Sequence, residues 1–368
     1  MRLPLEEMCL RIRASGTTDS ILSFLTEAID SPPTKNIERS IKELILVQAL
    51  DENENLTLLG KVLSSLPVDV RLGKLLLYGV ALKCLDPILT IASSLSISKT
   101  PFTRPFGNEQ LADLSRDSFK SGDSDLLTIV SAFDQWRVVI LKQGYSKAKK
   151  WCEGKFLSFQ SFTQIEESRS QLIKLLASVE GVPSNINTIK RKGVIETSVL
   201  SDFNVNSSIL RVLQTAIFAA LNPNLLMLPT EPDAPKKFCL VQPHSLGYVY
   251  PSSQKSAYCN GVLDSPSCWF TFHSLTRVNT GTKSRLGVWD LTKITTMHLL
   301  LLSREFKVEH RQGVIEADGV RINCIARTAV CIARFKDILK ETLERRIVGK
   351  STLEDEKIVE MMIDLLKS

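Results

Sequence analysis

The sequence predicts a mostly α-helical protein that also contains a small β-barrel domain. Apolar residues recur at helical spacing through most of residues 4–221, and the pattern changes to short strands between about residues 236 and 323. Helical spacing returns after residue 324. A chain of 368 residues with 43% hydrophobic side chains has enough apolar surface for more than one core, so we expect several domains.

The first part of the chain predicts three short amphipathic helices, over residues 4–12, from residue 17 or 18 to 29, and from Thr34 onward. The next stretch, VQALDENENLTLLG at residues 47–60, predicts a strand, a polar turn and a returning strand that ends at Gly60. Three helices followed by a hairpin are the element order of a winged helix. We therefore expect a winged helix over residues 1–70.

The third of these helices does not have the surface of a DNA-reading helix. Lys35, Arg39 and Lys42 alternate with Glu38 and Glu43, whereas recognition of the DNA major groove requires a basic outer face. The sequence favours a scaffold role over DNA recognition for this domain.

The leucine-rich stretch at residues 56–79 is expected to be a domain junction. After a brief helix that follows Gly60, Pro67 prevents the helix from continuing, and a new one is expected to start at Asp69 or the next residue. Arg71 and Lys74 lie in the first turns of the new helix. We expect each of them to pair with Asp69 or to be solvated.

Helical spacing then continues in segments separated by breaks that contain Pro, Gly or Ser, which predicts a helical bundle over residues 71–224. The expected helices cover residues 70–83, 86–95, 108–119, 123–142, 145–153, 158–180 and 207–221. Two basic clusters lie in this region: the stretch LKQGYSKAKKWCEGK, whose lysines accompany Tyr145 and Trp151, and the triplet Lys190-Arg191-Lys192. The first cluster has the composition of a phosphate-binding surface, but a solvated lysine face is the favoured interpretation.

Residues 225–324 predict the barrel, after a linker marked by Pro229, Pro232 and Pro235. The expected strands are KKFCLVQP, LGYVYPSS, CWFTFHSLTRV, SRLGVWDLTKIT, MHLLLLS, EFKVEH and VIEADGVRI. Short strands about 10 residues apart are typical of a small barrel. A helical segment is expected over residues 325–368.

The sequence contains no recognisable catalytic arrangement. The eight cysteines include no C-x-x-C pair, and no histidine lies at zinc-finger spacing from them. Gly349-Lys350-Ser351 lacks the earlier glycine of a phosphate-binding loop, and no D-E-A-H, H-E-x-x-H or G-x-S-x-G motif occurs. The absence of a signal peptide and of a long apolar run predicts a cytoplasmic protein, with a nuclear site left open.

The barrel carries the candidate binding residues. Arg277, Lys283 and Arg285 surround a turn at Gly281, and Lys255 lies near a strand end. Three aromatic residues, Trp269, Phe272 and Trp289, lie near these cations in the sequence. Phosphate contacts combined with base stacking would bind a single strand, although core packing explains the aromatic residues equally well.

Several stretches together resemble the C-terminal half of DEAH-box RNA helicases of the RNA helicase A-like group. They are PLEEMCLRIR, LTLLGKVLSSLPVDVRLGKLLLYG, CLDPILTIASSLS, SGDSDLLTIVSAFDQWR, WCEGKFLSFQ, AALNPN and YPSS. The resemblance extends from the start of the chain to about residue 348. It implies a winged helix, a ratchet-like helical bundle and an oligonucleotide-binding (OB) fold, which in the family stack on two RecA-like motor domains that bind ATP and Mg²⁺.

Those motor domains are not in this sequence, so we expect a non-catalytic piece of an ATP-dependent helicase. The resemblance implies that single-stranded RNA contacts Ser252 and Ser253, beside the candidates Lys255, Arg277, Lys283 and Arg285 of the residue-based prediction. The chain departs from the family at Tyr250, where histidine is common, at Gln254, where valine is common, and in MHLLLLSRE, which lacks the usual glycines. The alternative hypothesis is a protein-interaction scaffold that docks helicase partners such as glycine-rich activator proteins.

Overall fold

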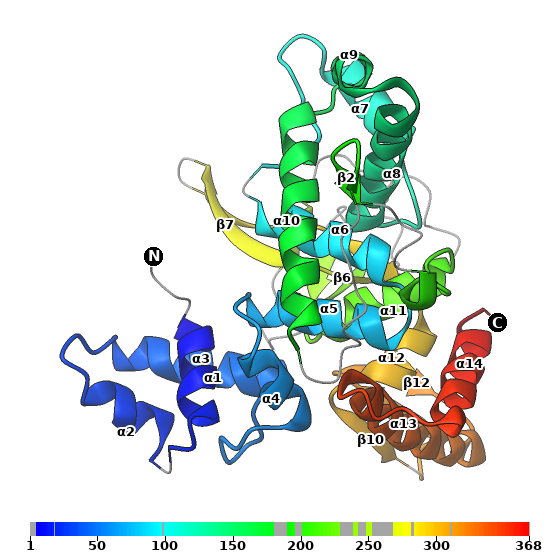
Figure 1. Ribbon diagram of the computed structural model, residues 1–368. Helices are drawn as coiled ribbons and strands as arrows, with labels where there is room; N and C mark the ends of the chain where they lie inside the picture. Colours follow the sequence, from blue (N-terminus) through cyan, green and yellow to red (C-terminus); the bar gives the residue numbers. More distant parts are fainter. Residues whose placement is uncertain are drawn as a thin grey trace.

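The computed structural model describes residues 5–17, 19–97, 99–179, 190–195, 201–228, 238–241, 248–251, 268–280, 283–309 and 311–367. Helices dominate this part of the chain (Figure 1). The first group is α1 Leu5–Ala14, α2 Ile21–Thr26, α3 Thr34–Leu46 and α4 Leu58–Ser64. The bundle contains α5 Val70–Ala81, α6 Leu85–Ser96, α7 Glu109–Asp117, α8 Asp125–Gln143, α9 Tyr145–Gly154, α10 Phe159–Ala177 and α11 Leu210–Leu221. Three further helices are α12 Thr296–Leu302, α13 Ala326–Ile347 and α14 Leu353–Lys367.

The helix predictions between residues 70 and 221 are confirmed, and each boundary lies within three residues of the predicted one. Capping side chains contribute to this agreement at α5, α8 and α10. The Ser124 hydroxyl accepts a hydrogen bond from the Leu127 amide at the start of α8, and the Ser158 hydroxyl accepts one from the Ser161 amide at the start of α10. Such caps satisfy amides that lack a partner inside the helix, so local sequence defines where these helices begin.

The hairpin predicted at residues 47–60 is reduced to one isolated antiparallel bridge, between Leu50 and Leu56. The polar turn is present, since the Asp51 carboxylate accepts hydrogen bonds from the amides of Asn53 and Asn55 at 2.9 and 2.8 Å. The returning strand that was expected to reach residue 60 does not form, because α4 begins at Leu58.

Gly60 lies inside α4 and does not end a strand. The Thr57 hydroxyl accepts a hydrogen bond from the Gly60 amide at 2.9 Å and so caps the helix. A Cβ atom added to Gly60 would lie 1.9 Å from the carbonyl oxygen of Ala49. Glycine is therefore required here for the close approach of α4 to the preceding backbone.

The two cations at the start of α5 also differ from the prediction. Arg71 pairs with Glu43 of α3 at 2.7 Å rather than with Asp69, whose side chain caps α5. Lys74 is only 2% exposed, and its ammonium lies 5.9 Å from the centre of the Tyr78 ring. Burial lowers the pKa of Lys74 to about 7, with a smaller contribution from the positive charge of Arg71. The prediction of a solvated lysine is wrong because this position faces the core.

A buried ion cluster joins three helices of the bundle. Asp86 of α6 pairs with Arg137 of α8 at 2.9 Å and with Arg169 of α10 at 2.5 Å. Burial acts to raise the pKa of Asp86, but the guanidinium groups of Arg169 and Arg137 outweigh this effect and hold the pKa below its ordinary value. Since buried charges are tolerated only when they are paired, the cluster requires the three helices to pack together.

The largest sheet has the strand order β7-β8-β5-β4-β3-β6-β9. Its neighbours are antiparallel except for β5 and β8, which run parallel. The strands are β3 Leu225–Leu228, β4 Phe238–Leu240, β5 Tyr248–Pro251, β6 Cys268–Thr271, β7 Ser274–Thr280, β8 Lys283–Trp289 and β9 Thr292–Ile294. Two smaller antiparallel sheets contain β1 Lys190–Arg191 with β2 Val194–Ile195, and β10 Phe306–Glu309 with β11 Val314–Ala317 and β12 Val320–Asn323.

Several predicted strands need correction. MHLLLLS forms helix α12, because the side chains of Thr295 and His298 make a capping box at its start. Leu225–Leu228, expected just before the linker prolines, is strand β3 inside the large sheet. CWFTFHSLTRV divides into β6 and β7, SRLGVWDLTKIT divides into β8 and β9 at Asp290, and VIEADGVRI is the hairpin of β11 and β12.

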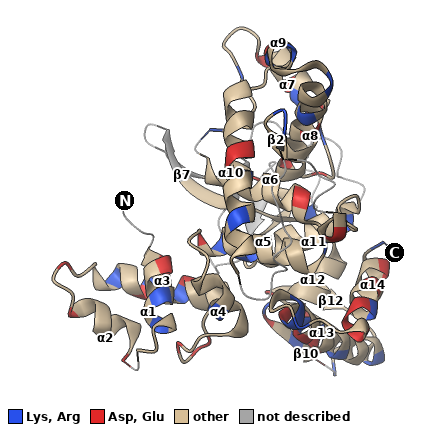
Figure 2. Ribbon diagram, in the orientation of Figure 1, with Lys and Arg blue, Asp and Glu red and all other residues tan. Residues whose placement is uncertain are grey.

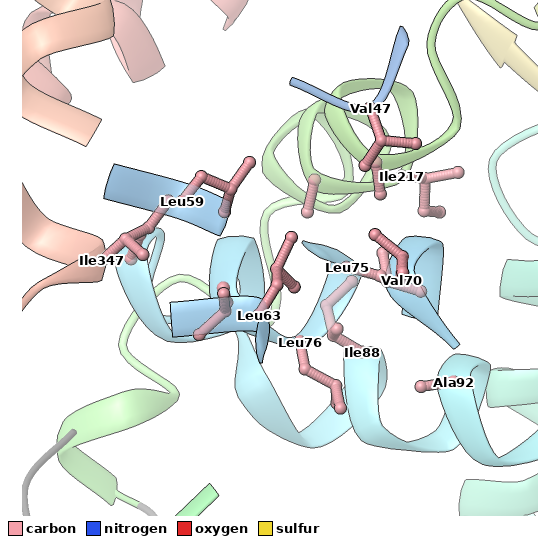
Figure 3. Packing of buried hydrophobic residues seen from close by; sticks show 14 of the residues in the cluster. Val47, Leu59, Leu63, Val70, Leu75, Leu76, Ile88, Ala92, Ile217 and Ile347 are labelled. Atoms are coloured by element: carbon pink, nitrogen blue, oxygen red, sulfur yellow. The ribbon is translucent and has the colours of Figure 1, made fainter. Parts of the chain in front are cut away.

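One hydrophobic core continues across the expected junction at residue 70. Leu63 of α4 and Val70 and Leu75 of α5 belong to the same cluster as Ile217 of α11 and Ile347 of α13 (Figure 3). The leucine-rich stretch is divided into two separate helices, as expected, but its buried side chains are shared. The first four helices are thus packed onto the bundle rather than folded around an independent core.

Candidate nucleic-acid interface

The predicted basic hairpin is formed by β7 and β8. Its register pairs Arg277 with Leu286, Val278 with Arg285 and Thr280 with Lys283. Arg277, Lys283 and Arg285 therefore fall within four consecutive residue pairs at the turn end of the hairpin. The structure describes their backbone positions but not their side chains, so their role in RNA binding stays a prediction.

Ser252, Ser253 and Lys255 lie outside the described residues. The strand before them, β5, ends at Pro251, which pairs with Val288 of β8. Val288 is three residues beyond Arg285, or roughly 10 Å along the strand at about 3.3 Å per residue. The end of β5 thus lies toward the end of β8 that is remote from the basic turn.

Of the three aromatic residues considered for stacking, only Trp289 is well exposed. Trp269 and Phe272 are buried, with 8% and 3% of their surfaces exposed, and serve as core residues. Trp289 is 40% exposed, and its indole nitrogen donates a hydrogen bond to the Thr276 hydroxyl at 2.9 Å. This bond orients an accessible ring across the hairpin, where a base could stack on it.

The strand that follows the hairpin is attached to the start of α8. The Asp125 amide donates to the Leu291 carbonyl at 2.8 Å, and the Leu291 amide donates to the Asp125 carboxylate at 3.0 Å. The hydroxyl groups of Ser124 and Thr292 are hydrogen-bonded at 2.7 Å, and Arg116 pairs with Asp125 at 2.9 Å. These contacts couple the base of the hairpin to the helical bundle.

Beside this attachment, the Asp290 carboxylate lies near the His273 imidazole. Burial raises the pKa of Asp290 to about 6, and the negative charge of Asp125 adds to the effect. The pKa of His273 is lowered, chiefly by burial, and its Nδ1 lies 3.9 Å from the Asp290 carboxylate. Near pH 7 the carboxylate is charged and the imidazole is neutral, so the pair is not a salt bridge at that pH.

Helix α3 keeps the mixed charge expected from the sequence (Figure 2). Lys35, Arg39 and Lys42 are exposed, while Glu43 is engaged with Arg71 of α5. The ion pair and the shared core attach this helix to the bundle.

A metal site and a membrane-spanning helix each place requirements on the described residues. No group of three or more His, Cys, Asp or Glu side chains in the described ranges is arranged to hold a metal ion. Within those same ranges, no helix combines the length and the apolar character needed to cross a membrane. His298 is buried at the start of α12, and burial lowers its pKa to about 4, so it acts as a neutral structural residue.

Comparison with protein families gives two adjacent matches. Residues 40–68 match the winged-helix part of the helicase associated domain (HA2), and residues 69–134 match its ratchet-like part. The border between the two matches, between residues 68 and 69, lies within the leucine-rich stretch at residues 56–79. The predictions of a winged helix and of a ratchet-like bundle are confirmed.

The chain is also similar over its whole length to parts of larger proteins. It is 29% identical to the ATP-dependent RNA helicase DHX29 of Homo sapiens, where the alignment covers 100% of this chain and 26% of that protein. It is 28% identical to the ATP-dependent DNA/RNA helicase DHX36 of Mus musculus, covering 100% of this chain and 36% of the relative. A shorter match, 38% identical over 48% of this chain and 14% of the relative, is to the DExH-box ATP-dependent RNA helicase DExH3 of Arabidopsis thaliana. The chain thus spans about a quarter to a third of the relatives that it matches along its full length.

Proposed function

We propose that this chain, which contains the winged-helix and ratchet-like parts of an HA2 domain, binds single-stranded RNA and couples motor movement to RNA translocation. The premise of this proposal is its homology to C-terminal parts of DEAH-box helicases. ATP and Mg²⁺ would be bound by RecA-like motor domains of the parent protein. The chain itself would supply a non-catalytic surface for the strand.

The domain limits that accompany this proposal are a winged helix at residues 1–70, a ratchet-like bundle at 71–224, an OB fold at 225–324 and a C-terminal helical segment at 325–368. The two family matches meet between residues 68 and 69, close to the first of these borders. The OB-fold assignment is supported by the strand-rich character of the third segment and by the resemblance of the chain to the helicase family.

The β7–β8 register carries the RNA-binding proposal. It brings Arg277, Lys283 and Arg285 into four residue pairs at the end of one hairpin, and phosphate groups bind such cations without regard to base sequence. The exposed ring of Trp289, near the other end of β8, would add sequence-tolerant stacking. The strand would therefore follow the hairpin from its basic turn toward its base.

The coupling part of the proposal is supported by the way the winged helix is mounted. Glu43 of α3 pairs with Arg71 of α5, and the two domains share buried side chains such as Leu63 and Leu75. A packed core moves as a unit because its interdigitated side chains resist sliding. A force applied by a motor domain to the winged helix would thus reach the bundle, and through Asp125 and Leu291 the base of the hairpin.

Fluorescence polarisation with a labelled single-stranded oligoribonucleotide, measured across a salt series, tests RNA binding. Each phosphate of a single strand that a protein cation neutralises contributes about 0.7 to the negative slope of log affinity against log salt concentration. Neutralising Arg277, Lys283 and Arg285 with glutamine should reduce that slope by roughly 1.5 to 2. An unchanged slope in a folded triple variant would contradict the assignment of these residues.

A second candidate function is protein docking. A groove of about 640 Å³ lies between the winged helix, the start of α5 and the segment that joins β6 to β7. The charged pair of Glu43 and Arg71 and the apolar residues Phe272 and Leu275 are among its lining, a combination suited to a peptide. Absence of RNA binding at low salt would favour this scaffold role.

A further inference from the structure

Several lysine positions lie on the helical bundle at α9 and the neighbouring end of α8 (Figure 2). We define the α9 basic patch as the exposed cations at the end of α8, along α9 and directly after it, and on the hairpin of β1 and β2. Its members are Lys142, Lys147, Lys149, Lys150, Lys155, Arg191 and Lys192. The candidate RNA site on β7 and β8 does not include any of them.

The fold brings together cations that are about 40 residues apart in sequence. The Lys192 ammonium donates a hydrogen bond to the Leu141 carbonyl at the end of α8, at 2.7 Å. Gly193 lies against the Tyr145 ring, since a Cβ atom added to it would be 3.7 Å from that ring. The residues of β2 are buried, so the β1–β2 turn is anchored beside α8 and α9 rather than projecting freely.

The patch has an unusual excess of positive charge. Residues 138–155 contain five lysines and one acidic residue, Glu153. None of these five lysines forms an ion pair within the part of the chain that the structure describes, whereas Arg71, Arg116 and Arg137 are each paired with a carboxylate. Lysines that have no carboxylate partner gain more from binding an anion than lysines that are already paired.

Exposed apolar groups accompany these cations. Tyr145 is 49% exposed, and Leu141 and Val138 are 38% and 47% exposed. The Tyr145 ring packs edge-on against Phe159, with 5.2 Å between the ring centres and an interplanar angle of 74°. This contact holds the tyrosine in place, so an incoming base would find a fixed stacking surface at little entropic cost.

We propose that the α9 basic patch is a second contact surface for single-stranded nucleic acid, with the cations binding successive phosphates and Tyr145 stacking on a base. The cations extend over three elements, which exceeds what a single small anion can contact. On α9, Lys147 and Lys150 are three residues apart, a spacing that places Cβ atoms about 5–6 Å apart, so neighbouring phosphates of one strand can engage both. This site goes beyond the proposed function, because it would bind the strand independently of the β7–β8 hairpin.

The test compares two matched triple variants of the whole chain by fluorescence polarisation with a labelled single-stranded oligoribonucleotide. The patch variant carries Lys142→Gln, Lys149→Gln and Arg191→Gln. The control carries Lys35→Gln, Lys61→Gln and Lys357→Gln, which removes the same charge from exposed positions on α3, α4 and α14. Lys192 is left unchanged because its hydrogen bond anchors the turn.

The patch variant should lower the salt slope by about 2, from three phosphates at about 0.7 each, and should weaken binding roughly ten- to a hundredfold at 0.1 M salt. The control should bind like the unmodified chain. Tyr145→Ala, with all cations kept, should weaken binding at least about fivefold while leaving the salt slope unchanged. Ultraviolet crosslinking of an RNA containing 5-iodouridine should label Tyr145, and this readout does not depend on the stability of any variant.

The patch proposal is overturned if the patch variant and the control bind equally, or if RNA crosslinks elsewhere but not near Tyr145. The β7–β8 variants described above separate the two sites. If the β7–β8 variants keep the RNA affinity of the unmodified chain while the patch variant loses affinity, the hairpin assignment is wrong and the patch proposal is supported. If only the hairpin variants lose affinity, the patch fails, and a chain that does not bind at low salt contradicts both.

Discussion

Replacing Gly60 by alanine tests why the leucine-rich junction contains glycine. In a helix, alanine is favoured over glycine by about 1 kcal/mol, so an unconstrained site would be stabilised. At Gly60 the new Cβ would lie 1.9 Å from the Ala49 carbonyl oxygen, whereas ordinary contact begins at 3.4 Å. The helix would have to move by more than 1 Å, and the oxygen that it displaces also accepts the Thr57 amide at 3.1 Å.

Overpacking of this kind typically costs about 1–3 kcal/mol, and loss of a helix cap costs about 1 kcal/mol more. After the gain in helix propensity, we expect Gly60→Ala to lower the free energy of unfolding by about 2 kcal/mol or more. Gly73→Ala is the matched control, because its new Cβ would meet the Leu63 Cδ2 atom at 2.8 Å, a terminal methyl group that can rotate away. Its free energy of unfolding should change by less than about 1 kcal/mol.

Urea unfolding followed by circular dichroism gives both values, and an unchanged dependence on urea concentration shows that the two variants unfold comparable surfaces. Equal free energies of unfolding for Gly60→Ala and Gly73→Ala would refute the argument. In that case a Cβ atom placed against a backbone oxygen would cost no more than one placed against a side-chain methyl group.

Three further substitutions test the buried charges. The pKa of Lys74 is lowered from 10.5 to about 7, so the unfolded chain binds the proton more tightly and stability rises with pH between these values. Lys74→Met should abolish that rise and increase the free energy of unfolding at pH 7 by about 3–5 kcal/mol, because each unit of pKa shift corresponds to about 1.4 kcal/mol. A pH profile of stability like that of the unmodified chain would count against burial of the lysine. Asp86→Asn should cost about 3–5 kcal/mol in urea unfolding, because two buried guanidinium groups lose their counter-charge, and a loss below about 1 kcal/mol would be inconsistent with the cluster. The pKa of Asp290 is raised from 3.8 to about 6, so the stabilising effect of the protonated carboxyl is complete below pH 3.8 and is lost as pH rises through 6. Asp290→Asn should remove this loss and increase the free energy of unfolding at pH 7 by about 1–3 kcal/mol. An equal decline of the free energy of unfolding with pH in both proteins would disprove the assignment.

Much of the helical part of the chain could be predicted because its signals are local. The break at Pro67 and the caps at Asp69 and Ser124 act within a few residues, and the apolar spacing of each helix is visible in the sequence. The segments that resemble DEAH-box helicases predicted the HA2 domains. Two of these segments contain Asp86 and Arg137, which form an ion pair in the core of the bundle. Of the candidate binding residues, the sequence indicated the basic hairpin but did not indicate which aromatic residue near it would be exposed.

The sequence by itself determined where most helices start and stop, because capping and hydrophobic periodicity depend on neighbours within one or two turns. The tertiary structure alone decided which polar groups are buried and which separated segments meet. Lys74 is buried by its place in the core, and Lys192 reaches the end of α8 across about 50 residues of intervening chain. Strand pairing is equally non-local. The formation of β3 and the division of β6 from β7 depend on partner strands that are distant in sequence, and no local pattern identifies those partners.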